Sequence, residues 1–181
     1  MKVLVATEKP FAAAAVNGIR EIVEGAGHEL ALLEKYTEKE QLLAAVADAD
    51  ALIVRSDKVT ADVVAAAKQL KIVVRAGAGY DNLDLPSCTE RGIVAMNTPG
   101  QNSNAVAELA LGLMIYMSRN QFTPGTGCEL SGKTIGIQGF GNIGQLVAKK
   151  AVGLGMNVLI LAPQPAEKHQ GWNTVPTIEE L

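Results

Sequence analysis

The sequence has few of the features that mark secreted, metal-binding or nucleic-acid-binding proteins. Its 181 residues include only two cysteines, Cys88 and Cys128, which are too few for a disulfide framework or a metal cluster. Aromatic residues make up 4 % of the chain and the net charge is −3, so there is no basic surface to attract nucleic acid. We therefore expect two plain thiols, no metal and no nucleic-acid partner.

Long hydrophobic runs are also missing. The longest, residues 105–117, contains Glu108 and is too short to span a bilayer. Met1 and Lys2 lead directly into a short apolar run, without the hydrophobic segment and cleavage site of a signal peptide. The sequence therefore predicts a cytoplasmic protein with no membrane partner.

The residues that are abundant indicate an α/β protein. Hydrophobic residues make up 48 % of the chain and charged residues 19 %. Strands are expected at residues 3–6, 29–33, 51–54, 72–74 and 93–95, and helices at 10–25, from 37, at 60–68 and at 86–90. Unbroken apolar strands separated by single helices indicate a parallel sheet covered on both faces. Residues 1–97 are therefore predicted to form one doubly wound, flavodoxin-like domain.

A turn-forming stretch, residues 97–100 (Asn-Thr-Pro-Gly), is expected to separate this domain from a second one at 98–181. Residues 104–118 are apolar almost all round, which predicts a helix packed between two layers at the junction. Thr37 with Glu40, and Thr177 with Glu180, have the spacing of capping boxes. Each pair therefore predicts the start of a helix.

The most informative stretch is KTIGIQGFGNIG, residues 133–144. A strand pattern at 134–138 is followed by Gly139, Gly141 and Gly144 at the spacing G-x-G-x-x-G, and then by a helical pattern. Glycines here permit a tight turn, close approach of backbone N–H groups to a pyrophosphate, and close packing of the helix on the strand. In a chain with 18 glycines a merely structural turn is the alternative, but the flanking strand and helix favour dinucleotide binding.

The domain that carries this motif is expected to be incomplete. After the glycine turn, only residues 158–161 and the short pair 174–175 have strand patterns. A complete dinucleotide domain has about six strands in two halves. Residues 98–181 are therefore predicted to be the first part of a Rossmann-type domain.

Candidate ligand-binding residues follow two strands whose carboxyl ends share one edge of the predicted sheet. Arg55 and Ser56 come after residues 51–54, and Gly77 and Ala78 come after residues 72–74. Arg55 offers a planar fork of donors for a carboxylate or phosphate, with a salt bridge to Asp57 as the alternative. The small residues at 76–79 let backbone N–H groups approach an anion, or form a plain tight turn.

The remaining polar residues of interest have structural interpretations. Asp81 and Asp84 are expected to form a turn and a helix cap. His28 and His169 receive no function, and Trp172, the only tryptophan, is predicted to pack against the second domain.

Four segments in order have the character of family signatures. They are VRSDKVT at 54–60, VRAGAGYDNLDL at 74–85, MNTPGQNSNAVAELALGL at 96–113 and LSGKTIGIQGFGNIG at 130–144. They resemble consecutive motifs of the D-isomer-specific 2-hydroxyacid dehydrogenases, and within that family look most like those of the bacterial D-3-phosphoglycerate dehydrogenases. The resemblance implies NAD-dependent oxidation of 3-phosphoglycerate to 3-phosphohydroxypyruvate, in serine biosynthesis, by a homodimer. Glycerate, lactate and glyoxylate-type substrates stay open.

The resemblance also implies roles for matching residues. Residues 1–97 become the substrate (lid) domain, in which Arg55 and Ser56 match the substrate loop. Gly77 and Ala78 match the backbone clamp on the substrate carboxylate, with Ala78 also near the nicotinamide. The pyrophosphate site in residues 98–181 corresponds to Gly139, Gly141, Asn142, Ile143 and Gly144.

Two departures from the family pattern affect the expected activity. The family's catalytic arginine, glutamate and histidine have no counterpart in this sequence, so the chain alone is expected to be inactive. The acidic residue that binds the ribose is replaced by Ala162, which predicts weakened NAD binding. The alternatives are a non-catalytic anion- or nucleotide-binding module, a subunit-interaction remnant, or a chain without selected function whose open sheet edge favours association.

Overall fold

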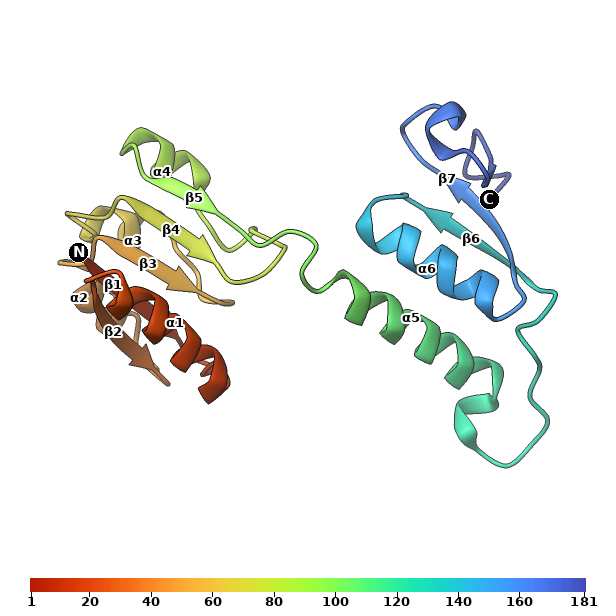
Figure 1. Ribbon diagram of the computed structural model, residues 1–181, viewed down its shortest axis with the longest axis horizontal. Coiled ribbons are helices and arrows are strands. Elements are labelled where there is room, and N and C mark those ends of the chain that lie inside the picture. The colour runs from red at the N-terminus through yellow and green to blue at the C-terminus, as the bar shows by residue number, and fades with distance from the viewer. The chain divides into compact units, whose positions relative to one another are not determined.

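The computed structural model describes all 181 residues, which form two compact units, Met1–Pro99 and Gly100–Leu181 (Figure 1). The division falls inside the turn at residues 97–100. Both units are built from parallel strands joined by helices. None of the helices combines the length and apolarity needed to cross a membrane.

The first unit contains a five-stranded sheet in the order β2-β1-β3-β4-β5, and every neighbouring pair is parallel. Its strands are β1 (Lys2–Thr7), β2 (Glu29–Glu34), β3 (Ala51–Val54), β4 (Ile72–Arg75) and β5 (Val94–Met96). This confirms the predicted doubly wound α/β fold. The chain runs from β1 outward to β2 and then crosses to the other side of β1, so the strand order reverses between β1 and β3.

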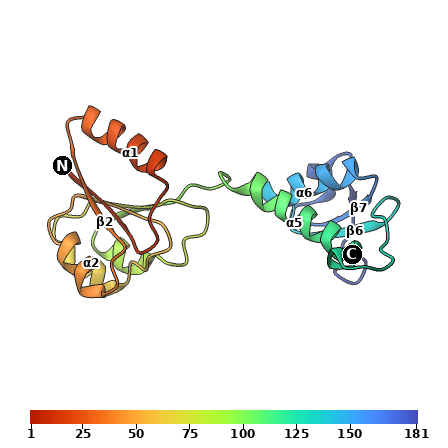
Figure 2. The same ribbon diagram turned by 90° about the horizontal axis from the view of Figure 1, so that it is seen from below.

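Helices lie on both faces of this sheet: α1 (Ala13–Gly25) on one, and α2 (Lys39–Val46), α3 (Ala61–Ala66) and α4 (Leu85–Glu90) on the other (Figure 2). The main core lies under α2, α3 and α4, where Leu52 and Val54 of β3 are fully buried. By contrast, α1 has no fully buried residue, and its Ile22 is 75 % exposed. The helix begins at Ala13, so the expectation that it opens at Pro10 is wrong by three residues.

Both predicted capping boxes need correction. The box of α2 lies one residue further on, with Glu38 as the N-cap and Gln41 at the third helical position. Gln41 Oε1 accepts the N–H groups of Glu38 and Thr37 at 3.1 and 3.0 Å, and a glutamine serves this role as well as a glutamate. No helix follows Thr177: the backbone bends there, and Leu181 N–H bonds the Ile178 carbonyl three residues back instead of a carbonyl four residues back.

The second unit contains a three-stranded parallel sheet in the order β6-β7-β8. Its elements are α5 (Ser103–Ser118), η1 (Asn120–Phe122), β6 (Thr134–Gln138), α6 (Asn142–Gly153), β7 (Asn157–Leu161), η2 (Ala166–His169) and β8 (Asn173–Thr174). The core of the unit forms between the sheet, α6 and α5. Trp172 packs against it with its ring 5.4 Å from that of Phe140, which confirms the predicted packing role.

The helix α5 is not enclosed as the sequence predicts. Only Ser103, Ala107 and Leu111 are buried, because one face of α5 packs on α6. On its other side Leu109 and Met117 are 63 % and 62 % exposed. The apolar surface of α5 therefore exceeds what its own unit covers.

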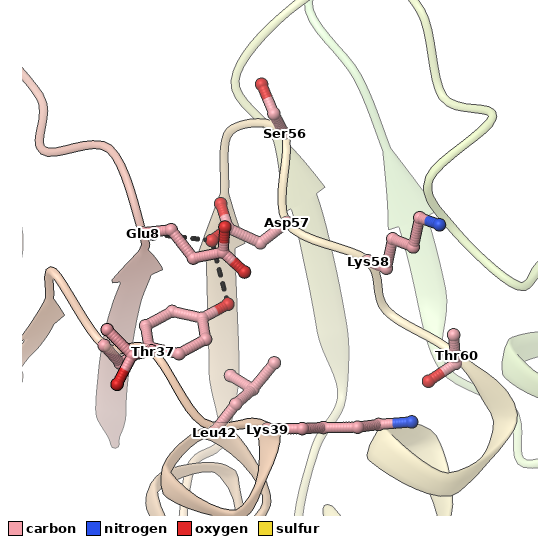
Figure 3. A pocket seen from close by; sticks show the side chains of 9 residues that line it. Glu8, Thr37, Lys39, Leu42, Ser56, Asp57, Lys58 and Thr60 are labelled. Carbon is pink, nitrogen blue, oxygen red and sulfur yellow. Dashed lines mark hydrogen bonds between the residues drawn. The ribbon is translucent and has the colours of Figure 1, made fainter.

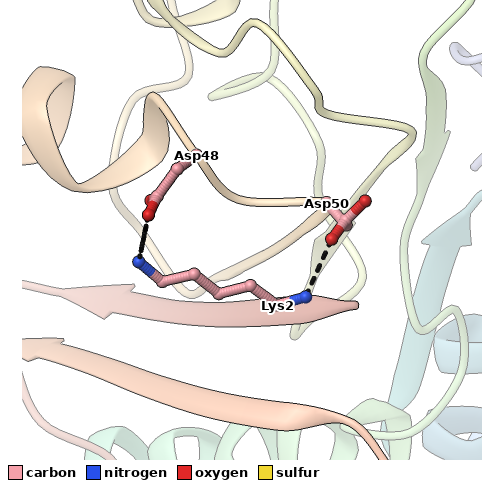
Figure 4. Close-up of polar contacts among 3 residues, drawn as sticks. All are labelled: Lys2, Asp48 and Asp50. Carbon is pink, nitrogen blue, oxygen red and sulfur yellow. Dashed lines mark hydrogen bonds and ion pairs between the residues drawn. The ribbon is translucent and has the colours of Figure 1, made fainter.

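A polar network fixes the amino ends of three strands in the first unit (Figure 4). The Asp50 carboxylate accepts the backbone N–H of Lys2 at 2.8 Å and the ammonium of Lys71 at 2.9 Å. The Lys2 side chain pairs with Asp48 at 2.7 Å. These bonds lower the pKa of Asp50 and Asp48, the main cause being the Lys2 N–H for Asp50 and the Lys2 ammonium for Asp48.

This distribution of carboxylate pKa values predicts where acid destabilises the fold. The pKa of Asp62 falls from 3.8 to about 2, mainly through its bond with Lys39, and then through that from the Thr60 hydroxyl. A carboxyl whose pKa is lower in the folded chain stabilises it above the unfolded pKa, and that stabilisation is lost as pH falls through the folded pKa. Urea titrations should therefore show a free energy of unfolding that is level near neutrality and falls between about pH 4 and pH 2.

The variant Asp62→Asn should show a shallower fall in that interval, because it has no proton to take up. Glu21→Gln, which removes an exposed carboxylate outside every ion pair, is the matched control. Identical acid slopes for Asp62→Asn and the unmodified chain would contradict the assignment.

Candidate functional site

The glycine turn joins β6 to α6, and each of its glycines has a separate structural reason. Gly139 has φ +91°, a conformation that other residues rarely adopt, and its N–H bonds the Leu161 carbonyl at the end of β7 at 2.7 Å. A Cβ on Gly144 would overlap the Gly139 carbonyl oxygen, so α6 packs directly on the turn. A Cβ on Gly141 would meet nothing within 4 Å, which leaves open space above the backbone.

The N-terminus of α6 offers free donors beside this open space. Asn142 and Ile143 begin the helix, and no side chain caps it. The first N–H groups of a helix have no intrahelical partner, and the helix dipole makes this end favourable for an anion. Gln145 Nε2 donates to the Phe140 carbonyl at 3.1 Å, which braces the turn. The geometry therefore suits a phosphate group.

A pocket of about 540 Å³ opens at the carboxyl ends of β6 and β7, next to Gly139. Its lining consists of Gln138, Gly139, Leu161, Ala162, Pro163 and Pro176. The lining contains no aspartate or glutamate. Ala162 is the first residue after β7, where the family pattern places the acidic ribose ligand.

The two histidines lie in different units, His28 in the first and His169 in the second. His169 is in η2, its ring packs 5.3 Å from that of Phe140, and its Nε2 is buried without a hydrogen-bond partner. His28 lies at the amino end of β2, opposite the edge where ligands bind in such sheets.

In the first unit, the structure brings the two candidate loops together. Arg55 and Ser56 follow β3, and the loop after β4 lies beside them because Ala76 N–H bonds the Val54 carbonyl at 2.8 Å. Arg55 is exposed and takes part in none of the five ion pairs. The alternative of a salt bridge between Arg55 and Asp57 is therefore wrong.

The loop after β4 offers fewer backbone donors than its sequence implies. The Gly77 N–H is occupied, since it bonds the Arg75 carbonyl at 2.8 Å. The N–H groups of Ala78 and Gly79 donate to no protein acceptor. The loop is held from behind, because Asn97 Nδ2 donates to the Ala78 carbonyl at 2.7 Å and Thr98 N–H to the Gly77 carbonyl at 2.9 Å.

Arg75 lies beside the candidate loops, and sequence reasoning assigned it no role. A Cβ on Gly77 would overlap its guanidinium, so glycine is needed at 77 for the arginine side chain to lie across the loop. The Arg75 Nε is buried without a hydrogen-bond partner. The sequence feature that could have identified Arg75 is its position at the end of β4, beside β3, the strand that leads into Arg55.

A second pocket, of about 350 Å³, lies where the strand order reverses between β1 and β3 (Figure 3). Its lining residues follow β1, β2 and β3 or come from α2 and the start of α3; they are Glu8, Tyr36, Thr37, Lys39, Leu42, Ser56, Asp57, Lys58 and Thr60. Asp57 and Tyr36 are buried and hydrogen-bonded to each other at 2.8 Å. Burial, and then the bond to Asp57, raise the pKa of Tyr36.

The acidic residues after Gly79 have the structural roles that the sequence predicts. Asp84 is the N-cap of α4 and accepts the Ser87 N–H at 3.1 Å. Asp81 lies in the preceding turn.

Comparison with known proteins identifies the family. The model of the catalytic domain of the D-isomer-specific 2-hydroxyacid dehydrogenases matches residues 5–181. Hydroxypyruvate reductase of Thermotoga maritima is 43 % identical over 153 residues, which cover 77 % of this chain and 50 % of that protein. D-3-phosphoglycerate dehydrogenase of Methanocaldococcus jannaschii is 42 % identical over 160 residues, which cover 79 % of this chain and 30 % of that protein. The chain thus spans half or less of these curated relatives.

Solved structures agree. NAD⁺-bound 3-phosphoglycerate dehydrogenase of Entamoeba histolytica matches with a TM-score of 0.90 at 50 % identity, over 99 % of this chain and 58 % of that one. NAD-dependent formate dehydrogenase of Staphylococcus aureus, in complex with NAD, matches with a TM-score of 0.83 at 28 % identity, over 100 % of this chain and 62 % of that one. Because the sequence motifs, the solved structures and the family model agree, this chain belongs to the D-isomer-specific 2-hydroxyacid dehydrogenases.

Proposed function

We propose that these residues supply the substrate loops and the pyrophosphate site of an NAD-dependent dehydrogenase that oxidises 3-phosphoglycerate to 3-phosphohydroxypyruvate, a step of serine biosynthesis. The observation that carries the proposal is the edge of the first sheet. Arg55, in the loop after β3, and Arg75, the last residue of β4, lie there beside the free N–H groups of Ala78 and Gly79. Two guanidinium groups and two amides match a substrate that bears both a carboxylate and a phosphate.

A second substrate class has support of its own. The relative from Thermotoga maritima, at 43 % identity, is a hydroxypyruvate reductase, whose named substrate carries no phosphate. Such a substrate would need only one of the two arginines. Binding of D-glycerate as tightly as 3-phosphoglycerate would favour this second candidate.

In the proposed reaction these residues bind and orient the substrate. Arg55 and Ser56 on one side, and the amides of Ala78 and Gly79 on the other, hold the anionic groups and so fix the hydroxyl-bearing carbon. Bound NAD would accept the hydride from that carbon. The proton of the hydroxyl needs a base. His28 lies at the amino end of β2, away from the substrate loops, and the family's catalytic histidine has no counterpart in this sequence. We therefore expect these 181 residues alone to bind substrate without turnover.

The glycine turn and the α6 N-terminus are the proposed pyrophosphate site, with Gly139, Gly141, Asn142, Ile143 and Gly144 around the phosphates. Support comes from the free helix end and the space above Gly141. The lack of a carboxylate beside Ala162 supports weak binding of the adenosine ribose. By the resemblance of its motifs, we also propose that the protein acts in the cytoplasm.

The substrate proposal predicts a specific loss of binding. Arg55→Ala should weaken binding of D-3-phosphoglycerate, measured by isothermal titration, by about 10- to 100-fold, since it removes charge-assisted hydrogen bonds. Arg55→Lys should recover only part of the loss, because an ammonium lacks the planar fork. Arg20→Ala, which breaks an exposed pair with Glu24 on α1, is the control. Unchanged binding by Arg55→Ala would contradict the proposal.

The cofactor proposal predicts a gain of binding. Ala162→Asp places a carboxylate after β7, where it can accept from a ribose hydroxyl, so NAD affinity should rise about 10-fold. Ala166→Asp adds the same charge in η2, outside the pocket beside Gly139, and should leave the affinity unchanged or lower. Equal effects of the two variants in a fluorescence titration would show that Ala162 is not the ribose position.

The exposed side of α5 supports the proposed homodimer. Leu109, Leu113 and Met117 recur at helical spacing and are 63 %, 53 % and 62 % exposed. We expect light scattering to give a mass near twice 19.0 kDa. Leu109→Lys should restore the monomer mass, whereas Val152→Lys, on an exposed apolar residue of α6, should not. A monomeric unmodified chain would argue against the dimer.

A further inference from the structure

Asp57, in the loop after β3, is buried and held by several hydrogen bonds. Its side chain is buried, with the residue only 6 % exposed, and it takes part in no ion pair. Asp57 Oδ1 accepts both the Glu8 N–H at 2.7 Å and the Tyr36 hydroxyl at 2.8 Å (Figure 3). These donors follow β1 and β2, so the side chain ties the end of β3 to the end of its neighbour β1 and to that of β2, the next strand beyond β1.

The main chain of Asp57 is held from the opposite side. Its carbonyl accepts from Asn82 Nδ2 at 2.8 Å, and Asn82 lies in the turn that follows the loop at 76–79. Two residues later, Val59 N–H donates to the Asn82 carbonyl at 2.8 Å and the Val59 carbonyl accepts the Asp84 N–H at 2.9 Å. The residue directly after Ser56 is thus fastened both to β1 and to the segment that carries Gly77 and Ala78.

We propose that Asp57 is a positioning residue for substrate binding: it holds Arg55 and Ser56 at the distance from the Ala78 amide loop that lets both engage one anionic substrate. The inference rests on the proposed function, which assigns these loops to the substrate. Arg55 itself is exposed and free of ion pairs, so its loop depends on the residue that follows Ser56 for its anchor. A loop held in its bound conformation loses less conformational entropy when ligand binds.

The chain contains a matched control for this idea at the other end of the same strand. Asp50 precedes β3 as Asp57 follows it. It too accepts one backbone N–H of the β1 segment (Figure 4) and one side-chain donor, the ammonium of Lys71. Its position is at the amino ends of the strands, away from both candidate loops. Removing either carboxylate removes a similar set of hydrogen bonds, but only Asp57 belongs to the loop that carries Arg55 and Ser56.

The test compares binding of D-3-phosphoglycerate with stability in a set of variants. Asp57→Ala should weaken binding about 10-fold, and Asp57→Asn, which keeps an oxygen acceptor in place, should recover most of it. Tyr36→Phe removes one donor only and should give an intermediate loss. Asp50→Ala should lower the thermal midpoint while leaving the dissociation constant unchanged. If Asp57→Ala does not fold, Tyr36→Phe and Asp57→Asn decide the question.

A double-mutant cycle with Arg55 shows whether Asp57 acts through that loop. If it does, Asp57→Ala should weaken binding by less than about twofold in an Arg55→Ala background, because the positioned group is already gone. Equal losses in both backgrounds, unchanged binding by Asp57→Ala, or an Asp57→Asn variant as weak as Asp57→Ala would each overturn the inference alone. Failure of the unmodified chain to bind would overturn the proposed function, and this inference with it.

Discussion

The pairing of β1 with β3 is the constraint on which the first unit depends, because it fixes the loop after β3, and the loop after β4 is in turn bonded to β3. The pair is tied at both ends by a carboxylate: Asp50 accepts the Lys2 N–H at one end, and Asp57 accepts the Glu8 N–H at the other. Between them the register runs from Val3 opposite Ala51 to Ala6 opposite Val54. Since strand order reverses at this pair, its carboxyl end is where an α/β sheet leaves room for a ligand.

The proposed anion sites of the two units are built in different ways. The first presents arginine side chains and two free amides on loops that other residues brace. The second uses backbone geometry: positive φ at Gly139, contact between Gly144 and the turn, and an uncapped helix end. A family motif in the second unit therefore specifies the path of the chain, whereas affinity for a particular nucleotide depends on side chains such as that at Ala162, which the motif does not include.

Much of this fold follows from local sequence, because apolar runs and glycines act on their own neighbourhood. The strands and the glycine turn were predictable for that reason. The bond between Tyr36 and Asp57 was not, since 21 residues separate them and only the sheet order makes them neighbours. Nor was the place of Arg75 across Gly77, which depends on a side-chain conformation. The α2 capping box lies one residue beyond its predicted place because Gln41, and not Glu40, accepts the N-cap N–H. The burial of α5 was predicted wrongly because apolar composition does not say what covers a helix.

The distinction between binding and chemistry also follows from the residues. Groups that hold a substrate equally well before and during reaction lower its dissociation constant without speeding the chemical step. In the proposed substrate site, Arg55, Arg75 and the Ala78 amide are groups of that kind, as no titratable base stands among them. A rigid substrate loop then has a second effect, because a base can take the proton only from a hydroxyl that is already held in the right orientation. On this argument the Asp57 bonds matter most for orientation, and Arg55 matters most for affinity.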